Sequence, residues 1–200
     1  MCDSKQIHRM NSPPLDTLVP LLESKLGISP GFFQSLDGES GNDWSFIIKV
    51  HALIEAAISH LLTEHLQQPE LEGVFSRLDM SNKATGKVAF IKALGLLAEP
   101  ERRFVSSLSE LRNKLVHDVR NVNFDLAEDV EKMNPKNQEI FLKNFNLLST
   151  EVTNDVRNLF RFDPRQALWF AAMAFLGIVY LKASTQGNEQ PNGDAYRANK

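Results

Sequence analysis

The chain has 200 residues, a formal net charge of −3 and 42% hydrophobic residues. A chain of this length and apolar content can bury one substantial core, so we expect a single domain with tails. The slight negative charge argues against a protein that coats nucleic acid through bulk positive charge, although it leaves room for a local basic site. The single cysteine, Cys2, excludes an internal disulfide and a CxxC metal motif. With no apolar signal-peptide segment near the N-terminus, we expect a cytoplasmic protein.

The two ends of the chain differ in composition from the middle. Residues 1–14 are polar and contain two prolines, which predicts a flexible N-terminal segment. Residues 184–200 are rich in Gly, Asn and Gln, which predicts a disordered tail. The intervening residues 15–183 are expected to form one all-helical domain.

The first third of the chain predicts two helices separated by a loop. Leucines recur at helical spacing over residues 15–26, although Pro20 should bend or restart that helix. A loop with several glycines follows, and Asp43 is the expected N-cap of a strong helix over 44–66. The apolar stripe of this helix leaves four polar residues toward its edges: Lys49, His51, Glu55 and His60.

The middle third predicts two more helices. After a break around Pro69 and Gly73, Ser81 or Asn82 would cap an apolar helix that reaches Leu97 and that Gly86 and Gly95 weaken. Pro100 suits the first turn of the next helix, whose buried stripe consists of Phe104, Val105, Leu108, Leu111 and Leu115.

The last third predicts a turn and then four helices. Residues 119–126 have a mixed pattern typical of an extended or turn segment, and helices are expected near 127–133, 138–148 and 152–160. Asp163 and Pro164 give a cap and first-turn signal for a last helix over 165–183.

This last helix contains an uncharged stretch, residues 167–181, that needs a covering surface. The stretch is shorter than the about 20 apolar residues that span a membrane, although Trp169 and Tyr180 near its ends would suit a membrane interface. We favour a core or dimer-interface helix, with membrane association as the alternative.

The stretch ELRNKLVHD, residues 110–118, carries the residues best suited to chemistry: Arg112, Asn113 and His117. Asn113 and His117 share a helix face, which the long side chain of Arg112 can reach. His117 would act as general acid or base on an RNA 2′-OH or a leaving 5′-oxygen, and Arg112 would neutralise charge on the phosphate. Asn113 would orient the substrate or the imidazole, and no metal or cofactor is needed.

A purely structural interpretation of these residues stays open. An Arg followed by a His four to six residues later is common by chance, and the helix dipole favours His near a helix C-terminus. The spacing alone is therefore weak support for catalysis.

The block LSELRNKLVHD resembles the R-N-x-x-x-H motif of the HEPN superfamily, all-helical domains of many prokaryotic toxin and defence systems. The segment FIIKVHALIEAAISHLL is also similar to the first core helix of such domains. This resemblance, over about residues 44–126, implies a metal-independent RNase in which Arg112 and His117 are the catalytic pair and Asn113 follows the arginine. It further implies an RNA substrate, a homodimer with one shared cleft and a neutralising antitoxin partner.

A second resemblance gives an alternative function. The succession of SFIIKVHALIEAAISHLL, KVAFIKALGLL and LRNKLVHDVRNVNFDLAEDV is similar to mannitol operon repressor-like proteins. Acidic residues follow the motif there too, here Asp125, Glu128 and Asp129. This resemblance implies a non-catalytic regulator of transcription that acts through protein partners.

Other candidate sites have weaker patterns. His51 and Glu55 are four residues apart, but no HExxH or paired-carboxylate motif supports a metal; in the nuclease interpretation Lys49, His51 and Glu55 would flank the cleft. Three serines, Ser106, Ser107 and Ser109, lack a nucleophile motif and are expected as helix-surface hydroxyls. Two small basic clusters are expected as solvated charge or as contacts to a nucleic-acid backbone: Lys83 with Lys87, and Arg102 with Arg103.

Overall fold

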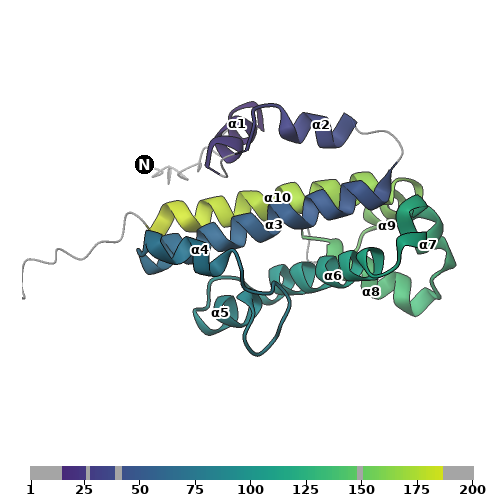
Figure 1. Cartoon of the computed structure of the whole chain (residues 1–200). Coiled ribbons are helices and arrows are strands. Elements are labelled where there is room, and N and C mark those ends of the chain that lie inside the picture. The colour runs from purple at the N-terminus through teal and green to yellow at the C-terminus, as the bar shows by residue number, and fades with distance from the viewer. Residues whose placement is uncertain (1–14, 26–27, 39–41, 148–150, 187–200) are drawn as a thin grey trace, which may run out of the picture.

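The computed structural model describes residues 15–25, 28–38, 42–147 and 151–186. This part of the chain contains ten α-helices, two short 3-10 helices and no strand, which confirms the all-α prediction (Figure 1). Residues 1–14 and 187–200, which hold the predicted N-terminal segment and most of the predicted tail, lie outside the described residues.

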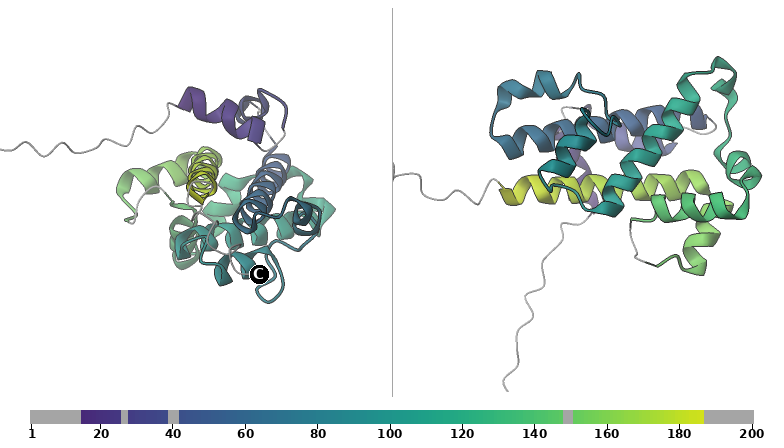
Figure 2. Two further views of the ribbon diagram at one scale, coloured as in Figure 1. Left: turned by 90° about the vertical axis from the view of Figure 1, so that its left-hand side faces the viewer. Right: turned by 90° about the horizontal axis from the view of Figure 1, so that it is seen from below.

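Two long helices, α3 (Asp43–Leu66) and α10 (Pro164–Gln186), pack side by side at the centre of the fold (Figures 1 and 2). The predicted apolar stripe of α3 is buried over its whole length, and its fully covered members include Ile47, Val50, Ile54, Ile58, Leu61 and Leu62. The facing side of α10 buries Leu168, Phe175 and Leu176. Because α3 has one apolar face at helical spacing, it must bury that face against another element, and α10 provides it.

The start of α3 differs by one residue from the prediction. Asn42 is the N-cap, with an extended backbone and a side-chain oxygen that accepts the Ser45 N–H at 3.0 Å. Asp43, the predicted cap, is already helical. Its carboxylate accepts the Leu126 N–H at 2.8 Å and pairs with Arg165 at 3.1 Å, and so ties three segments together.

Helix α6 (Glu99–Val116) packs on α3, with α5 (Lys87–Ala93) at one end and α8 (Pro135–Phe145) along its side. Phe104 on α6 joins the layers, since its ring lies 5.7 Å from that of Phe145 and 5.2 Å from that of Phe175. The core therefore continues from α8 through α6 to α10, and it holds α6 rigidly against α3.

Two regions predicted as loops contain short helices. The first is α2 (Phe32–Gly38), which occupies the expected glycine loop. It follows the predicted helix α1 (Leu15–Lys25), which continues through Pro20. The carboxylate of Glu23 is buried and accepts the N–H groups of Gly31 at 2.9 Å and Phe33 at 3.1 Å, which fixes the start of α2. The break after α3 holds a 3-10 turn, η1 (Pro69–Leu71), and α4 (Glu72–Phe75).

Helix α5 is shorter than predicted, and neither Ser81 nor Asn82 caps it. Gly86 is the N-cap residue, and Asn82 instead accepts the N–H groups of the preceding loop at Ala84 and Thr85. A Cβ atom at Gly86 would lie 2.5 Å from a backbone oxygen of this loop, so the tight loop requires glycine there.

The C-terminal elements follow the sequence prediction closely. They are η2 (Val119–Asn123), α7 (Leu126–Lys132), α8, α9 (Asn154–Phe162) and α10. Asp163 caps α10 by accepting the Gln166 N–H at 2.9 Å. The helix extends beyond its predicted end at residue 183, and the hydroxyls of Ser184 and Thr185 donate to the helix carbonyls of Tyr180 and Lys182. Residues 184–186, predicted as the start of the tail, are thus helical.

Two described helices, Asp43–Leu66 and Pro164–Thr185, are long and apolar enough to cross a membrane by length and composition. In the structure they are packed against each other, with 67% of the most apolar part of α3 and 44% of that of α10 buried. Phe170 and Leu181 are among the exposed residues of α10. The core helices of soluble proteins pass the same test of length and composition.

Candidate functional site at the end of helix α6

The three motif residues lie at the C-terminal end of α6. Arg112 and Asn113 are half-buried in the last turns, and His117 is exposed as the residue that ends the helix. The backbone N–H of His117 donates to the Asn113 carbonyl at 3.2 Å, so His117 still follows the helical path. Asn113 and His117 therefore share one face, as predicted.

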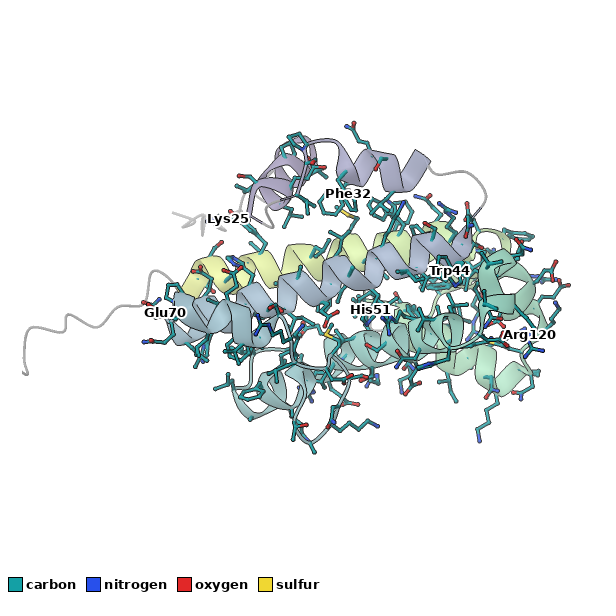
Figure 3. The ribbon with its side chains drawn as sticks, in the orientation of Figure 1. Lys25, Phe32, Trp44, His51, Glu70 and Arg120 are labelled. Atoms are coloured by element: carbon teal, nitrogen blue, oxygen red, sulfur yellow. The ribbon has the colours of Figure 1, made fainter. Side chains whose placement is uncertain are left out.

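The last turn of α6 is held by two side chains from other elements. The indole Nε1 of Trp44, at the start of α3, donates to the Leu115 carbonyl at 3.2 Å, and Asn121 Nδ2 donates to the Lys114 carbonyl at 2.8 Å. These bonds satisfy carbonyls that a helix end leaves without intrahelical partners. Figure 3 shows Trp44 and Arg120 at this end of the molecule, and His51 further along α3. The backbone beneath His117 is thus fixed from two sides.

Asp118, next to the motif histidine, has other partners. Its Oδ1 accepts the Arg120 N–H at 2.9 Å and caps η2, and the Arg120 guanidinium binds both carboxylate oxygens at 2.7 to 3.0 Å. These hydrogen bonds from Arg120 hold the pKa of the exposed Asp118 carboxyl below its usual range. No hydrogen bond links Asp118 to His117 in the described part of the chain.

Arg112 is half-buried and lies close enough to α3 to affect the pKa of its His51. Its Nη1 donates to Asn113 Oδ1 at 3.0 Å. Its charge also reaches His51 on α3, where it helps to lower the pKa of that imidazole. Among the described residues no hydrogen bond joins Arg112 to His117. The helix therefore brings the three residues to one place, but the guanidinium and the imidazole are separate groups in this monomer.

Beside Arg112 lies a buried polar layer between α3 and α6, formed by His51, Glu55, Lys87 and Ser109. The Nε2 of His51 lies 3.2 Å from Ser109 Oγ, its Nδ1 lies 3.9 Å from Glu55, and Glu55 binds Lys87 Nζ at 2.7 Å. Burial is the main cause that lowers the pKa of His51 below 6.5, and the nearby Glu55 carboxylate opposes that shift.

The buried polar layer corrects three sequence predictions. His51, expected at the edge of its helix, is 7% exposed; Ser109, expected on the surface, is 1% exposed. Lys87, expected in a solvated basic cluster, is completely buried. The sequence did indicate that two of these residues are buried, because residues four apart share a helix face. Ser109 lies four residues after the buried Val105, and Lys87 lies four residues before the buried Ile91.

The metal and acidic candidates have local roles in the described part of the chain. No group of three or more His, Cys, Asp or Glu residues there is placed to hold a metal ion, and the carboxylate of Glu55 is bound to Lys87. The three acidic residues after the motif also have partners: Asp125 caps α7, Glu128 pairs with Lys132, and Asp129 pairs with Lys114.

The surface around His117 is open and partly apolar. Val119 is 85% exposed and Val122 is 44% exposed. Five pockets in the described part of the chain are lined by residues other than Arg112, Asn113 and His117. These five pockets therefore do not include the surface at His117.

No protein-family model, curated protein or solved structure matches the chain.

Proposed function

We propose that the protein is a metal-independent endoribonuclease of toxin or defence type, with His117 and Arg112 as its catalytic pair. The observation that carries the proposal is that the His117 side chain is exposed while its backbone is held in place. Its imidazole is exposed at a rigidly held helix end, and its acidic neighbour Asp118 is engaged by Arg120. A general acid or base must be free to reach a substrate proton, and His117 meets that geometric requirement.

The chemistry divides between the two side chains. His117 takes the proton of a ribose 2′-OH, or returns a proton to the leaving 5′-oxygen, as the phosphodiester is cut. Arg112 stabilises the charge on the phosphate. Among the described residues, a single hydrogen bond, to Asn113, occupies its guanidinium, which carries five N–H donors. Asn113 orients Arg112 through that bond.

A second copy of the chain supplies a wall of the cleft in this proposal. The exposed Val119 and Val122, directly after the motif, give two apolar contacts at the position where a homodimer partner would pack. Pairing two motifs across such an interface would place one Arg112 opposite the His117 of the other copy. A toxin of this kind also requires a neutralising antitoxin protein, which would cover the same surface.

A non-catalytic regulator resembling the mannitol operon repressor is the alternative. The observation that favours it is the lack of a hydrogen bond between Arg112 and His117 in the described structure, with Arg112 instead bound to Asn113 near His51. In this alternative the motif is structural, and the exposed surface of η2 binds a protein partner.

Cleavage of labelled single-stranded RNA by the purified chain in EDTA tests the proposal. We expect cleavage that survives chelation and falls by about 100-fold or more in both Arg112→Ala and His117→Ala. The matched control is His65→Ala, a histidine at the opposite end of α3. No cleavage by folded wild-type protein would support the regulator instead. Cleavage that persists in His117→Ala would show that His117 is not the catalytic group.

Expression in cells gives a second test. Wild-type protein produced without an antitoxin should slow growth, and His117→Ala should relieve the effect at equal protein level. Harmless accumulation of folded wild-type protein would contradict a toxin function.

A further inference from the structure

A positively charged pocket lies on α5 and α6, toward the end of α6 opposite to His117. It has a volume of about 310 Å³ and is lined by four basic side chains, Lys83, Lys92, Arg102 and Arg103, together with Glu99 and Glu110. These six side chains sum to a charge of +2, whereas the whole chain carries −3. From the sequence, Lys83 and the two arginines were expected in separate clusters and Lys92 was not singled out, whereas the fold brings these four side chains together.

Arg103 in this pocket has an unmet hydrogen-bonding need. Its guanidinium pairs with Glu99 through one terminal nitrogen, but its Nε is buried without a hydrogen-bond partner. Buried N–H groups are almost always satisfied in folded proteins, and an unsatisfied one costs about 1–3 kcal/mol. The Arg103 side chain as a whole is 31% exposed and lines the pocket, so a shift of its guanidinium toward a ligand oxygen would let Nε donate and would remove that cost.

The other polar groups of the pocket suit the same kind of ligand. Lys83 and Lys92 are exposed and have no ion pair with another described residue. The pocket also contains Ser106, Ser107 and Asn144, with Asn144 Nδ2 bonded to Ser107 Oγ at 2.8 Å. Ammonium, guanidinium, hydroxyl and amide donors around one hollow form a site for phosphate oxygens.

The pocket continues toward the catalytic end of α6. A neighbouring pocket between α6 and α8 shares Ser107, Glu110 and Asn144 with it and reaches Lys114. Lys114 is about 16 Å from Arg103 along the helix and lies three residues before His117. We call these two adjoining pockets the α6 groove.

Residues of the α6 groove and residues of the motif follow one another along the same face of helix α6. Positions 103, 106, 110, 113 and 117 are separated by three or four residues and therefore lie along one face of the helix. An elongated ligand held at Arg103 and running along this face would arrive at Asn113 and His117. A single phosphate ion would fill only one end of this track.

We propose that the α6 groove binds the phosphate backbone of a single-stranded RNA and leads the strand to His117. This inference rests on the proposed nuclease function, because it takes its substrate to be the bound strand. Lys83, Lys92 and Arg103 contact phosphates away from the scissile bond. They contribute to affinity and leave the chemical step to Arg112 and His117.

Binding of a labelled single-stranded RNA to the full chain, followed by fluorescence anisotropy over a series of salt concentrations, tests the groove. The His117→Ala background keeps the RNA intact. The double variant Lys83→Gln/Lys92→Gln should weaken binding about tenfold at about 0.1 M salt and should lower the salt slope by about 1.4. The matched control, Lys132→Gln/Lys136→Gln, removes the same charge from α7 and α8 and should bind like the parent.

A third variant tests whether the Nε donor of the Arg103 guanidinium contributes to binding. Arg103→Lys keeps the charge but removes the Nε donor, so it should weaken binding while the salt slope stays nearly constant. Unchanged affinity in this variant and in Lys83→Gln/Lys92→Gln would overturn the inference. Adenosine monophosphate that binds as tightly as the RNA would also overturn it, since the site would then recognise a lone phosphate.

The groove and the nuclease can fail separately. If wild-type protein cuts RNA in EDTA while the groove variants bind RNA as the control does, the groove inference is wrong and the nuclease stands. If the groove variants lose binding while wild-type protein cuts no RNA, the RNA groove stands and the nuclease fails.

Discussion

Helices α3 and α6 meet at two polar regions, and the two regions differ in access to solvent. In the buried polar layer His51, Lys87 and Ser109 are shielded from solvent, Glu55 is partly exposed, and the four side chains contact one another. The end of α6, with Asn113, His117 and the η2 cap Asp118, is open. Buried polar groups must satisfy one another, so the first region stabilises the packing of the two helices. The second region is held in place by hydrogen bonds to its backbone, and the His117 imidazole stays accessible to a ligand.

The largest expected effect on stability separates the buried ion pair from an exposed one. Glu55→Gln leaves the completely buried Lys87 charge uncompensated and should lower the free energy of unfolding by about 3 kcal/mol, at the low end for a buried pair because Glu55 is 32% exposed. The matched control Glu139→Gln breaks the exposed pair with Arg157 and should cost about 0–1 kcal/mol. Denaturant unfolding measures both.

A second variant checks the cause of that loss. Lys87→Met added to Glu55→Gln removes the buried charge and should restore most of the stability. Equal, small effects of Glu55→Gln and Glu139→Gln would instead show that the Lys87 ammonium is solvated and would contradict its burial in the buried polar layer.

An intermediate effect should appear in the pH dependence of stability. Burial, with help from Arg112, holds the pKa of His51 below 6.5 in the folded protein. The unfolded chain therefore takes up a proton at higher pH than the folded one, and His51 lowers stability as the pH falls below about 6.5. The free energy of unfolding should fall less steeply with acid in His51→Gln than in the wild type. Parallel curves for the two proteins would show that His51 is not shielded.

The smallest expected effect concerns the support of the open region. Trp44→Phe keeps an aromatic ring but loses the hydrogen bond to the Leu115 carbonyl, and it should cost about 1 kcal/mol. The matched control is Trp169→Phe, at a ring that packs against Phe33 and Phe46. If only Trp44→Phe also slows RNA cleavage, the indole bond positions the end of α6; equal cleavage in both variants would make its role one of stability alone.

Periodicity predicted the long helices well, because burial of one face dominates their formation. The predicted starts of α3 and α10 lie one residue after the observed starts, and the predicted cap at Asp163 was correct. The missed helix α2 begins where the buried carboxylate of Glu23 binds two N–H groups, a tertiary contact that no local pattern contains. The pairing of α3 with α10 likewise depends on distant residues.

The candidate site was predictable only in part. The spacing of Asn113 and His117 fixes their shared face, and the structure has it. The hydrogen bond from Arg112 to Asn113, and the closeness of Arg112 to His51 on α3, depend on side-chain conformation and helix packing, which sequence spacing does not contain. Ser109 and Lys87 were misplaced because polar residue types favour the surface on average, while their partners His51 and Glu55 are far away in sequence.

Acylation of histidines by diethylpyrocarbonate, followed residue by residue with mass spectrometry alongside RNA cleavage, tests the division between the two regions most directly. We expect that His117 is modified early, that cleavage is lost in step with its modification, and that His51 stays unmodified while the fold is intact. Full modification of His117 with undiminished cleavage, or modification of His51 as fast as that of His117, would contradict it.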